Sequence, residues 1–169
     1  MDEEPSEYAR AMAENGRYAE AFDRSRLTAA PLTGLAIVAC MDARIDIEDA
    51  LGLRAGDAHI IRNAGGLVTD DVIRSLVVSQ QLMGTDEIIV IEHSGCGLHG
   101  ASEAAIRART AELTGESPDA VDLAFGAFAD LEANLREQLD RLRTNRFLRP
   151  VPIHGLIYDV VTGRLHEIA

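Results

Sequence analysis

The sequence predicts an α/β fold with a mixed, mostly parallel central sheet, flanking helices and an N-terminal helical arm. Three observations lead to this prediction. Short runs rich in Ile, Val and Leu alternate with longer amphipathic stretches, as in parallel strands joined by helices. A polar, partly amphipathic stretch precedes the first of these runs. The last two runs are separated by the turn-forming pair Thr162 and Gly163, as in a hairpin.

A chain of 169 residues has the size of one domain with a substantial core. We therefore expect a single unit over residues 1–169, with a helical arm at 1–30 and the core at 35–168. In the arm, a helix is predicted from Ser6 to about Arg26.

The arm helix carries an apolar stripe that a turn-like Asn-Gly pair at 15–16 interrupts. Such a helix either packs on a neighbouring subunit or covers the sheet of its own chain, and the residues alone favour neither interpretation. The stripe consists of Tyr8, Met12, Tyr18 and Phe22.

The first half of the core alternates strand and helix. Residues 35–39 and 58–61 are predicted as strands, and between them 45–51 predicts a short helix that ends near Gly52. The next helix is too apolar for a surface helix. It begins at Thr69 or Asp70, either of which can cap it, and ends at Gly84. A strand rich in Ile and Val follows at 86–91.

The second half predicts two helices and a closing hairpin. The first helix covers 98–113, and a Pro- and Gly-containing break follows it. A long helix is predicted over 118–145 because apolar residues recur there at helical spacing. Strands at 153–161 and 164–168 form the hairpin, so the last strand is an antiparallel edge.

Composition excludes several classes of partner. The formal net charge is −12, whereas nucleic acid and anionic membranes require basic surface. The N-terminal segment lacks the pattern of a signal peptide, and no apolar run is long enough to span a bilayer. We expect a cytoplasmic protein that binds neither nucleic acid nor membrane, in which two cysteines stay reduced.

Groups that can bind a metal follow two predicted strands. Cys40, Asp42 and Arg44 come directly after the first strand, and His93 and Cys96 come after the strand at 86–91. In open α/β sheets, ligands bind at the carboxyl ends of strands. Zinc takes thiolate and imidazole ligands, and a catalytic site supplies three of them and leaves one position open. The sequence therefore predicts a zinc site of two cysteines and one histidine.

Simpler interpretations exist for each group. A cysteine after a buried strand is usually a small hydrophobic residue. Asp42 and Arg44 share a face of an extended segment, so they form either a solvated ion pair or an oriented carboxylate beside the metal. A redox pair of Cys40 with Cys96 is a further possibility.

Three segments together resemble the signature segments of the β-class carbonic anhydrases. They are 40–44 (CMDAR), 56–65 (GDAHIIRNAG) and 93–97 (HSGCG), in the family's order and approximate spacing. The closing segment 155–165 is also similar to the end of that family, in its short form.

The resemblance implies that Cys40, His93 and Cys96 bind Zn²⁺ and that Asp42 and Arg44 form a catalytic dyad beside it. The implied reaction is the reversible hydration of CO2 to bicarbonate and a proton, by attack of a zinc-bound hydroxide that the dyad orients. The family's functional unit is a homodimer or a dimer of dimers, and its N-terminal arm reaches across to the partner.

Two other functions stay open. Some relatives hydrolyse carbonyl sulfide or carbon disulfide on the same scaffold. A non-catalytic, zinc-stabilised interaction domain is the second alternative, although such a site has no use for an oriented carboxylate.

Overall fold

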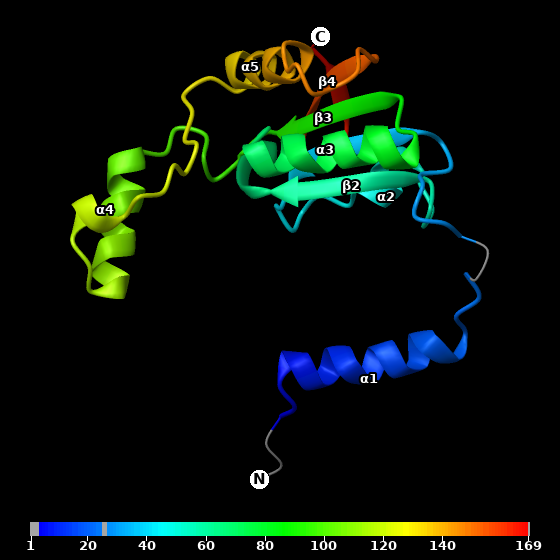
Figure 1. Ribbon diagram of the computed structural model, residues 1–169. Coiled ribbons are helices and arrows are strands. Elements are labelled where there is room, and N and C mark those ends of the chain that lie inside the picture. Colours follow the sequence, from blue (N-terminus) through cyan, green and yellow to red (C-terminus); the bar gives the residue numbers. More distant parts are fainter. Residues whose placement is uncertain (1–3, 25–26, 169) are drawn as a thin grey trace.

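The computed structural model describes residues 4–24 and 27–168, and its centre is a five-stranded sheet in the order β2-β1-β3-β4-β5 (Figure 1). Strands β1 to β4 pair in parallel, and β5 pairs antiparallel with β4. The predicted mixed, mostly parallel sheet is confirmed. The strands are β1 (Leu35–Cys40), β2 (Ala58–Asn63), β3 (Glu87–His93), β4 (Ile153–Tyr158) and β5 (Leu165–Glu167).

Helices cover both faces of the sheet. Helices α3 and α5 pack on one face and α2 on the other, whereas α1 and α4 extend away from it (Figure 1). None of the helices in the described part of the chain is long and apolar enough to cross a membrane. The α-helices are α1 (Glu7–Glu20), α2 (Ile47–Leu51), α3 (Asp70–Met83), α4 (Glu103–Thr114) and α5 (Leu131–Arg143), and the two 3₁₀ turns are η1 (Ala64–Gly66) and η2 (Pro118–Ala120).

Strand β1 lies in the interior of the sheet, between β2 and β3. Its side chains alternate between two core clusters: Ala36 and Val38 pack towards α3 and α5, and Ile37 and Ala39 pack towards α2. All four are fully buried. Burial on both faces explains why this strand is a continuous apolar run rather than an alternating one.

Both predicted ends of α3 and the predicted C-terminal end of α2 are confirmed by capping residues. The Thr69 hydroxyl accepts a hydrogen bond from the N–H of Val72 at the start of α3, and Gly84 ends that helix in the left-handed conformation. Gly52 ends α2 in the same way. These caps fix where the chain leaves each helix and re-enters the sheet.

The described part of the arm contains one helix, α1, which makes little contact with its own chain. Helix α1 begins after the cap Ser6, as predicted, and the turn-like pair Asn15 and Gly16 does not end it. It ends at Glu20 and residues 21–24 are not helical, so the predicted end near Arg26, which itself lies outside the described residues, is too late. No residue of α1 is buried, so the helix does not cover the sheet of its own chain.

The predicted long helix over 118–145 is wrong in its first half. Only a short turn at Pro118–Ala120 and the helix α5 are helical there. Helix α5 begins where the carboxylate of Asp130 accepts a hydrogen bond from the N–H of Ala133. The helix α4 likewise starts later than predicted, after the cap Ser102.

Two interactions keep the segment before α5 out of a helix. Gly126 has a φ of +76°, and a Cβ there would lie 2.3 Å from a methyl carbon of Leu67. The carboxylate of Glu103 accepts hydrogen bonds from the N–H groups of Ala127, at 2.8 Å, and Phe125, at 3.3 Å. A helix would need those N–H groups for itself, so a distant carboxylate overrides the apolar periodicity.

The core contains a carboxyl group that the sequence analysis did not single out. Glu92 is 1% exposed and points to the α5 side of β3. Its Oε1 accepts a hydrogen bond of 2.6 Å from Asn134, and its Oε2 has no partner among the described residues. Burial raises the pKa of Glu92 to about 8, although the hydrogen bond from Asn134 acts in the opposite direction. The side chain is therefore largely uncharged at neutral pH.

The buried Glu92 predicts a pH-dependent stability. Between its ordinary pKa of 4.5 and about 8, the folded chain holds a proton that the unfolded chain has lost, so stability falls as the pH rises. We expect Glu92→Gln to remove this effect. The unfolding free energy of the variant should rise relative to the original chain between pH 5 and pH 8, by up to about 1.4 kcal/mol per pH unit.

Urea unfolding at a series of pH values measures this difference. Glu137→Gln, on the exposed side of α5, is the matched control and should give a constant difference across the same range. Parallel stability curves for Glu92→Gln and the original chain would contradict an uncharged Glu92.

Candidate metal centre

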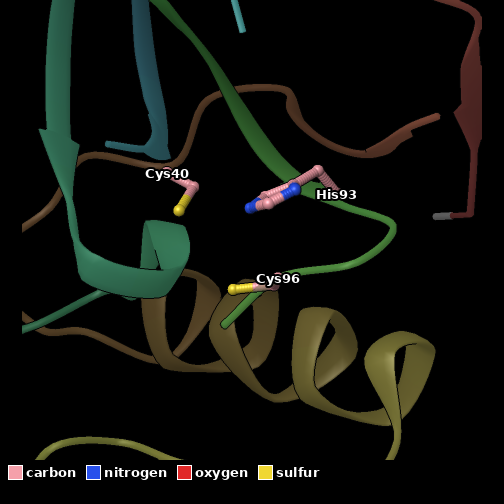
Figure 2. A group of neighbouring side chains, drawn as sticks. All are labelled: Cys40, His93 and Cys96. Atoms are coloured by element: carbon pink, nitrogen blue, oxygen red, sulfur yellow. The ribbon is translucent and has the colours of Figure 1, made fainter. Parts of the chain in front are cut away.

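Two cysteines and one histidine converge at the carboxyl ends of β1 and β3. Cys40 is the last residue of β1, His93 is the last residue of β3, and Cys96 lies in the loop that follows. The parallel register aligns Ala39 with Ile91, so both strands end at the same edge of the sheet. The two sulfurs and one imidazole nitrogen all lie within 4.8 Å of one another and face a common point (Figure 2).

The imidazole of His93 has one nitrogen paired and one free. Its Nδ1 lies 3.0 Å from the carbonyl oxygen of Ser94, which can only accept, so Nδ1 carries the proton. Its Nε2 is buried and has no hydrogen-bond partner in the described chain. Burial lowers the pKa of His93, which keeps the ring neutral. A neutral histidine fixed by a backbone carbonyl, with its other nitrogen free, is the usual state of a metal ligand.

The loop after β3 is held in place by the neighbouring strand. The N–H of Ser94 donates to the carbonyl oxygen of Tyr158 at 2.9 Å, and the Ser94 hydroxyl accepts from the N–H of Val160 at 3.1 Å. These contacts turn the chain so that Cys96 comes back beside His93. Cys96 and Cys40 are buried free thiols, and burial raises the pKa of Cys96.

Asp42 and Arg44 form a hydrogen-bonded ion pair beside this cluster. The Asp42 carboxylate accepts from Arg44 Nε at 2.9 Å, from Arg44 Nη2 at 2.6 Å and from the Arg44 main-chain N–H at 2.9 Å. Hydrogen bonds from the Arg44 side chain hold the pKa of Asp42 far below its usual range. Asp42 Oδ2 lies 3.8 Å from His93 Nε2. Arg44 also donates to the carbonyl oxygen of Gly95 at 3.0 Å, which connects the two loops of the site.

The backbone of η1 closes the other side of the cluster. Gly66 has a φ of +67°, and a Cβ there would lie 2.9 Å from both the nitrogen of Cys40 and the carbonyl oxygen of Ile91. Neither backbone atom can move without disturbing the sheet, so only glycine fits this position. The Asn63 amide group exchanges two hydrogen bonds with the main chain of Leu67 and fixes the same turn.

A cavity of about 420 Å³ opens over the cluster. Its wall is mostly apolar or backbone, and among the described residues that line it Asp42 carries the one charged side chain. The cavity therefore suits a small molecule with little polarity. Cys40, Met41, Asp42, Ala43, Ala64, Gly65, Cys96, Gly97 and Leu98 line it.

The donor set fits zinc. Two thiols and one imidazole nitrogen within reach of each other are zinc ligands, and three protein ligands are the count of a catalytic site. The buried His93 Nε2 without a partner supports this, because an unpaired polar atom in the core is costly unless something binds it.

Comparison with known proteins identifies the family. A family model described as carbonic anhydrase matches residues 35–165. Beta-carbonic anhydrase 1 of Mycobacterium tuberculosis is 40% identical over 158 residues, which are 93% of this chain and 94% of that protein.

The chain belongs to the β-carbonic anhydrase family.

Solved structures agree with this assignment. The crystal structure of a carbonic anhydrase from Streptococcus mutans superposes with a TM-score of 0.91 at 41% identity, covering 98% of this chain and 99% of that one. The family also has relatives with another name: a carbon disulfide hydrolase from Acidithiobacillus thiooxidans is 36% identical over 76% of this chain and 74% of that protein. The predicted family and the predicted enzyme class, carbonic anhydrase, are confirmed.

All five predicted site residues of this β-carbonic anhydrase lie together at one edge of the sheet. The carbonyl oxygens of Ser94 and Gly95 hold these residues and were not predicted, because backbone oxygens leave no signal in a sequence. The glycine pair at 65–66 does indicate the close approach at Gly66, since a site often requires close backbone approach.

Zinc uptake by the metal-free chain should release protons. Because burial raises the pKa of Cys96, this thiol is protonated at pH 7.5, and ligation requires the thiolate. We expect at least one proton to be released per zinc bound. Calorimetric titration in two buffers with different ionisation enthalpies measures the number, and Cys96→Ser should lower it. Zinc binding without proton release would contradict ligation by the Cys96 thiol.

Proposed function

We propose that the protein catalyses the reversible hydration of carbon dioxide to bicarbonate and a proton. The observation that carries this proposal is the carboxylate of Asp42, which three hydrogen bonds from Arg44 hold 3.8 Å from the free nitrogen of His93. A metal that only stabilised the fold would not need a fixed acceptor beside it. The family assignment supports the same reaction.

In this proposal Cys40, His93 and Cys96 hold the zinc ion. When bound, zinc lowers the pKa of water to about 7 and so supplies a hydroxide nucleophile at neutral pH. The Ser94 carbonyl fixes the His93 tautomer, so that Nε2 is available as a ligand. The buried position of all three ligands excludes competing water from their far sides.

Asp42 orients the nucleophile. Its carboxylate is ionised at neutral pH because Arg44 holds its pKa low, so it can accept a hydrogen bond but not donate one. We infer that Asp42 accepts the O–H of the nucleophile, which leaves an oxygen lone pair directed at the carbon of CO2. Arg44 keeps the carboxylate aimed by binding both of its oxygens. These contacts favour an open site, in which Asp42 faces the nucleophile rather than the metal.

The cavity wall suits CO2 as the substrate. Met41, Ala43 and Leu98 offer apolar surface on which a small uncharged molecule can lie. Carbon disulfide and carbonyl sulfide have the same linear shape and lack of charge, and a family relative is named as a carbon disulfide hydrolase. Hydrolysis of these sulfur compounds is therefore the second candidate function at the same site.

We propose that the working unit is a homodimer or a dimer of dimers, with the arm 1–30 on the partner. The apolar stripe of the arm supports this, since Tyr8, Met12 and Tyr18 on α1 and Phe22 after it are about half exposed or more within one chain.

A cytoplasmic location fits two free thiols, which oxidising compartments would not preserve.

Substitutions distinguish the role of the zinc ligands from the role of Asp42. We expect Cys40→Ser to lose zinc and CO2 hydration together, because it removes a ligand. Asp42→Ala should keep one zinc per chain and lower kcat about 10–100-fold, the usual cost of removing a group that supports a metal site. Metal analysis and stopped-flow hydration assays on the same preparations measure both quantities. An Asp42→Ala variant with full turnover would refute the proposed role of Asp42.

The substrate is tested by parallel assays. The purified zinc-loaded protein should hydrate CO2 with saturable kinetics and release little sulfide from carbon disulfide or carbonyl sulfide. Asp42→Ala serves as the control in both assays, because it should depress whichever reaction the site catalyses. Rapid sulfide release with poor CO2 hydration would favour the second candidate. Stoichiometric zinc without either activity would favour the zinc-stabilised interaction domain.

A further inference from the structure

Arg62 contacts the backbone of the candidate site but takes no part in the proposed hydration step. It is the penultimate residue of β2, where the parallel register pairs Ala39 with Arg62 and Cys40 with Asn63. Its side chain reaches over the end of the neighbouring strand. Nε donates to the carbonyl oxygen of Cys40 at 2.9 Å, and Nη2 donates to the carbonyl oxygen of Asp42 at 2.8 Å.

These two carbonyls belong to the segment that leaves the sheet. After Cys40 one more hydrogen bond ties this segment to β2, from the N–H of Met41 to the carbonyl oxygen of Asn63, at 2.8 Å. Beyond that point the two guanidinium donors of Arg62 connect the segment to β2. A guanidinium is planar and rigid, so two hydrogen bonds from it fix both the position and the direction of the backbone.

The carboxylate and the main chain of Asp42 are thus held by different residues. Arg44 binds the carboxylate, whereas Arg62 binds the main-chain carbonyl. That carbonyl also accepts from the N–H of Ile45 at 3.1 Å, which closes a local turn. The turn does not depend on Arg62, but its orientation relative to β2 does.

Within the described residues, the guanidinium of Arg62 binds backbone oxygens and forms no ion pair. In the part of the chain that the structure describes, no carboxylate oxygen lies within 4.0 Å of its guanidinium nitrogens. Its two observed acceptors are both backbone oxygens of site residues, and hydrogen bonds from an ionised donor are stronger than neutral ones.

We propose that Arg62 is a positioning residue for the reaction. It touches no reacting atom, and it acts through Asp42 by fixing the backbone that carries both Asp42 and the ligand Cys40. This inference rests on the proposed role of Asp42 in CO2 hydration. Lysine could satisfy one carbonyl but not both, since it lacks the planar fork.

The test uses the zinc-loaded full chain with Arg62→Met, which keeps an unbranched apolar stem and removes both donors. We expect kcat for CO2 hydration to fall about 10–100-fold, with the KM little changed and one zinc per chain retained. The kcat of Arg62→Lys should lie between that of Arg62→Met and that of the original chain. Arg109→Met is the matched control: it removes the same charge from an exposed pair with Glu112 on α4 and should leave kcat unchanged.

A double variant tests whether Arg62 acts through Asp42. In an Asp42→Ala background, Arg62→Met should cause little further loss of kcat, because the group that it positions is already absent. Additive losses would overturn the inference. A kcat for Arg62→Met equal to that of the original chain would overturn it too, as would an activity loss that only parallels lost zinc. If Arg62→Met does not fold, Arg62→Lys is used with the same criteria.

A spectroscopic measurement separates this inference from the proposed function. The absorption spectrum of the cobalt(II)-substituted chain reports the surroundings of the metal without any substrate. We expect Arg62→Met to change that spectrum and Arg109→Met to leave it unchanged, whether or not the chain hydrates CO2. An original chain without CO2 hydration would refute the proposed function alone, whereas an unchanged Arg62→Met spectrum would refute the role of Arg62 alone.

Discussion

The parallel pairing of β1 with β3 is the constraint on which the site depends. Because Ala39 lies opposite Ile91, the two strands end together, and the thiol of Cys40 and the imidazole of His93 emerge at one edge. Burial of both faces of these strands holds them rigidly, so the ligands are positioned by the most stable part of the fold. Cys96 needs only the short loop after β3 to join them.

Backbone oxygens give the site much of its order. The Ser94 carbonyl sets the tautomer of His93, the Gly95 carbonyl receives Arg44, and the carbonyls of Cys40 and Asp42 receive Arg62. Arg44 and Arg62 are therefore each tied to the main chain of another segment. The loops cannot shift independently, and the Asp42 carboxylate keeps one direction beside the ligands.

The sequence predicted the order of the strands and the strand ends that carry the five candidate residues, because strand ends and side-chain chemistry are visible in it. It did not predict the uncharged Glu92, because burial raises the pKa of this carboxyl and that burial depends on packing against α5, which lies far along the chain. The helix predicted over 118–145 failed for the same reason. Phe125 and Ala127 donate to Glu103 in a preceding helix, and periodicity carries no information about such a contact.

The backbone beside the ligands and the wall of the cavity differ in how freely they can vary. At Gly66 any side chain would collide with backbone atoms of β1 and β3, so this position is closed to variation. The cavity wall includes the side chains of Met41 and Leu98, and Met41 is 66% exposed. Selection for a longer or bulkier substrate would therefore act through Met41 and Leu98, and the ligand geometry would survive the change. One scaffold can thus acquire a new preference among linear, uncharged molecules without rebuilding its metal centre.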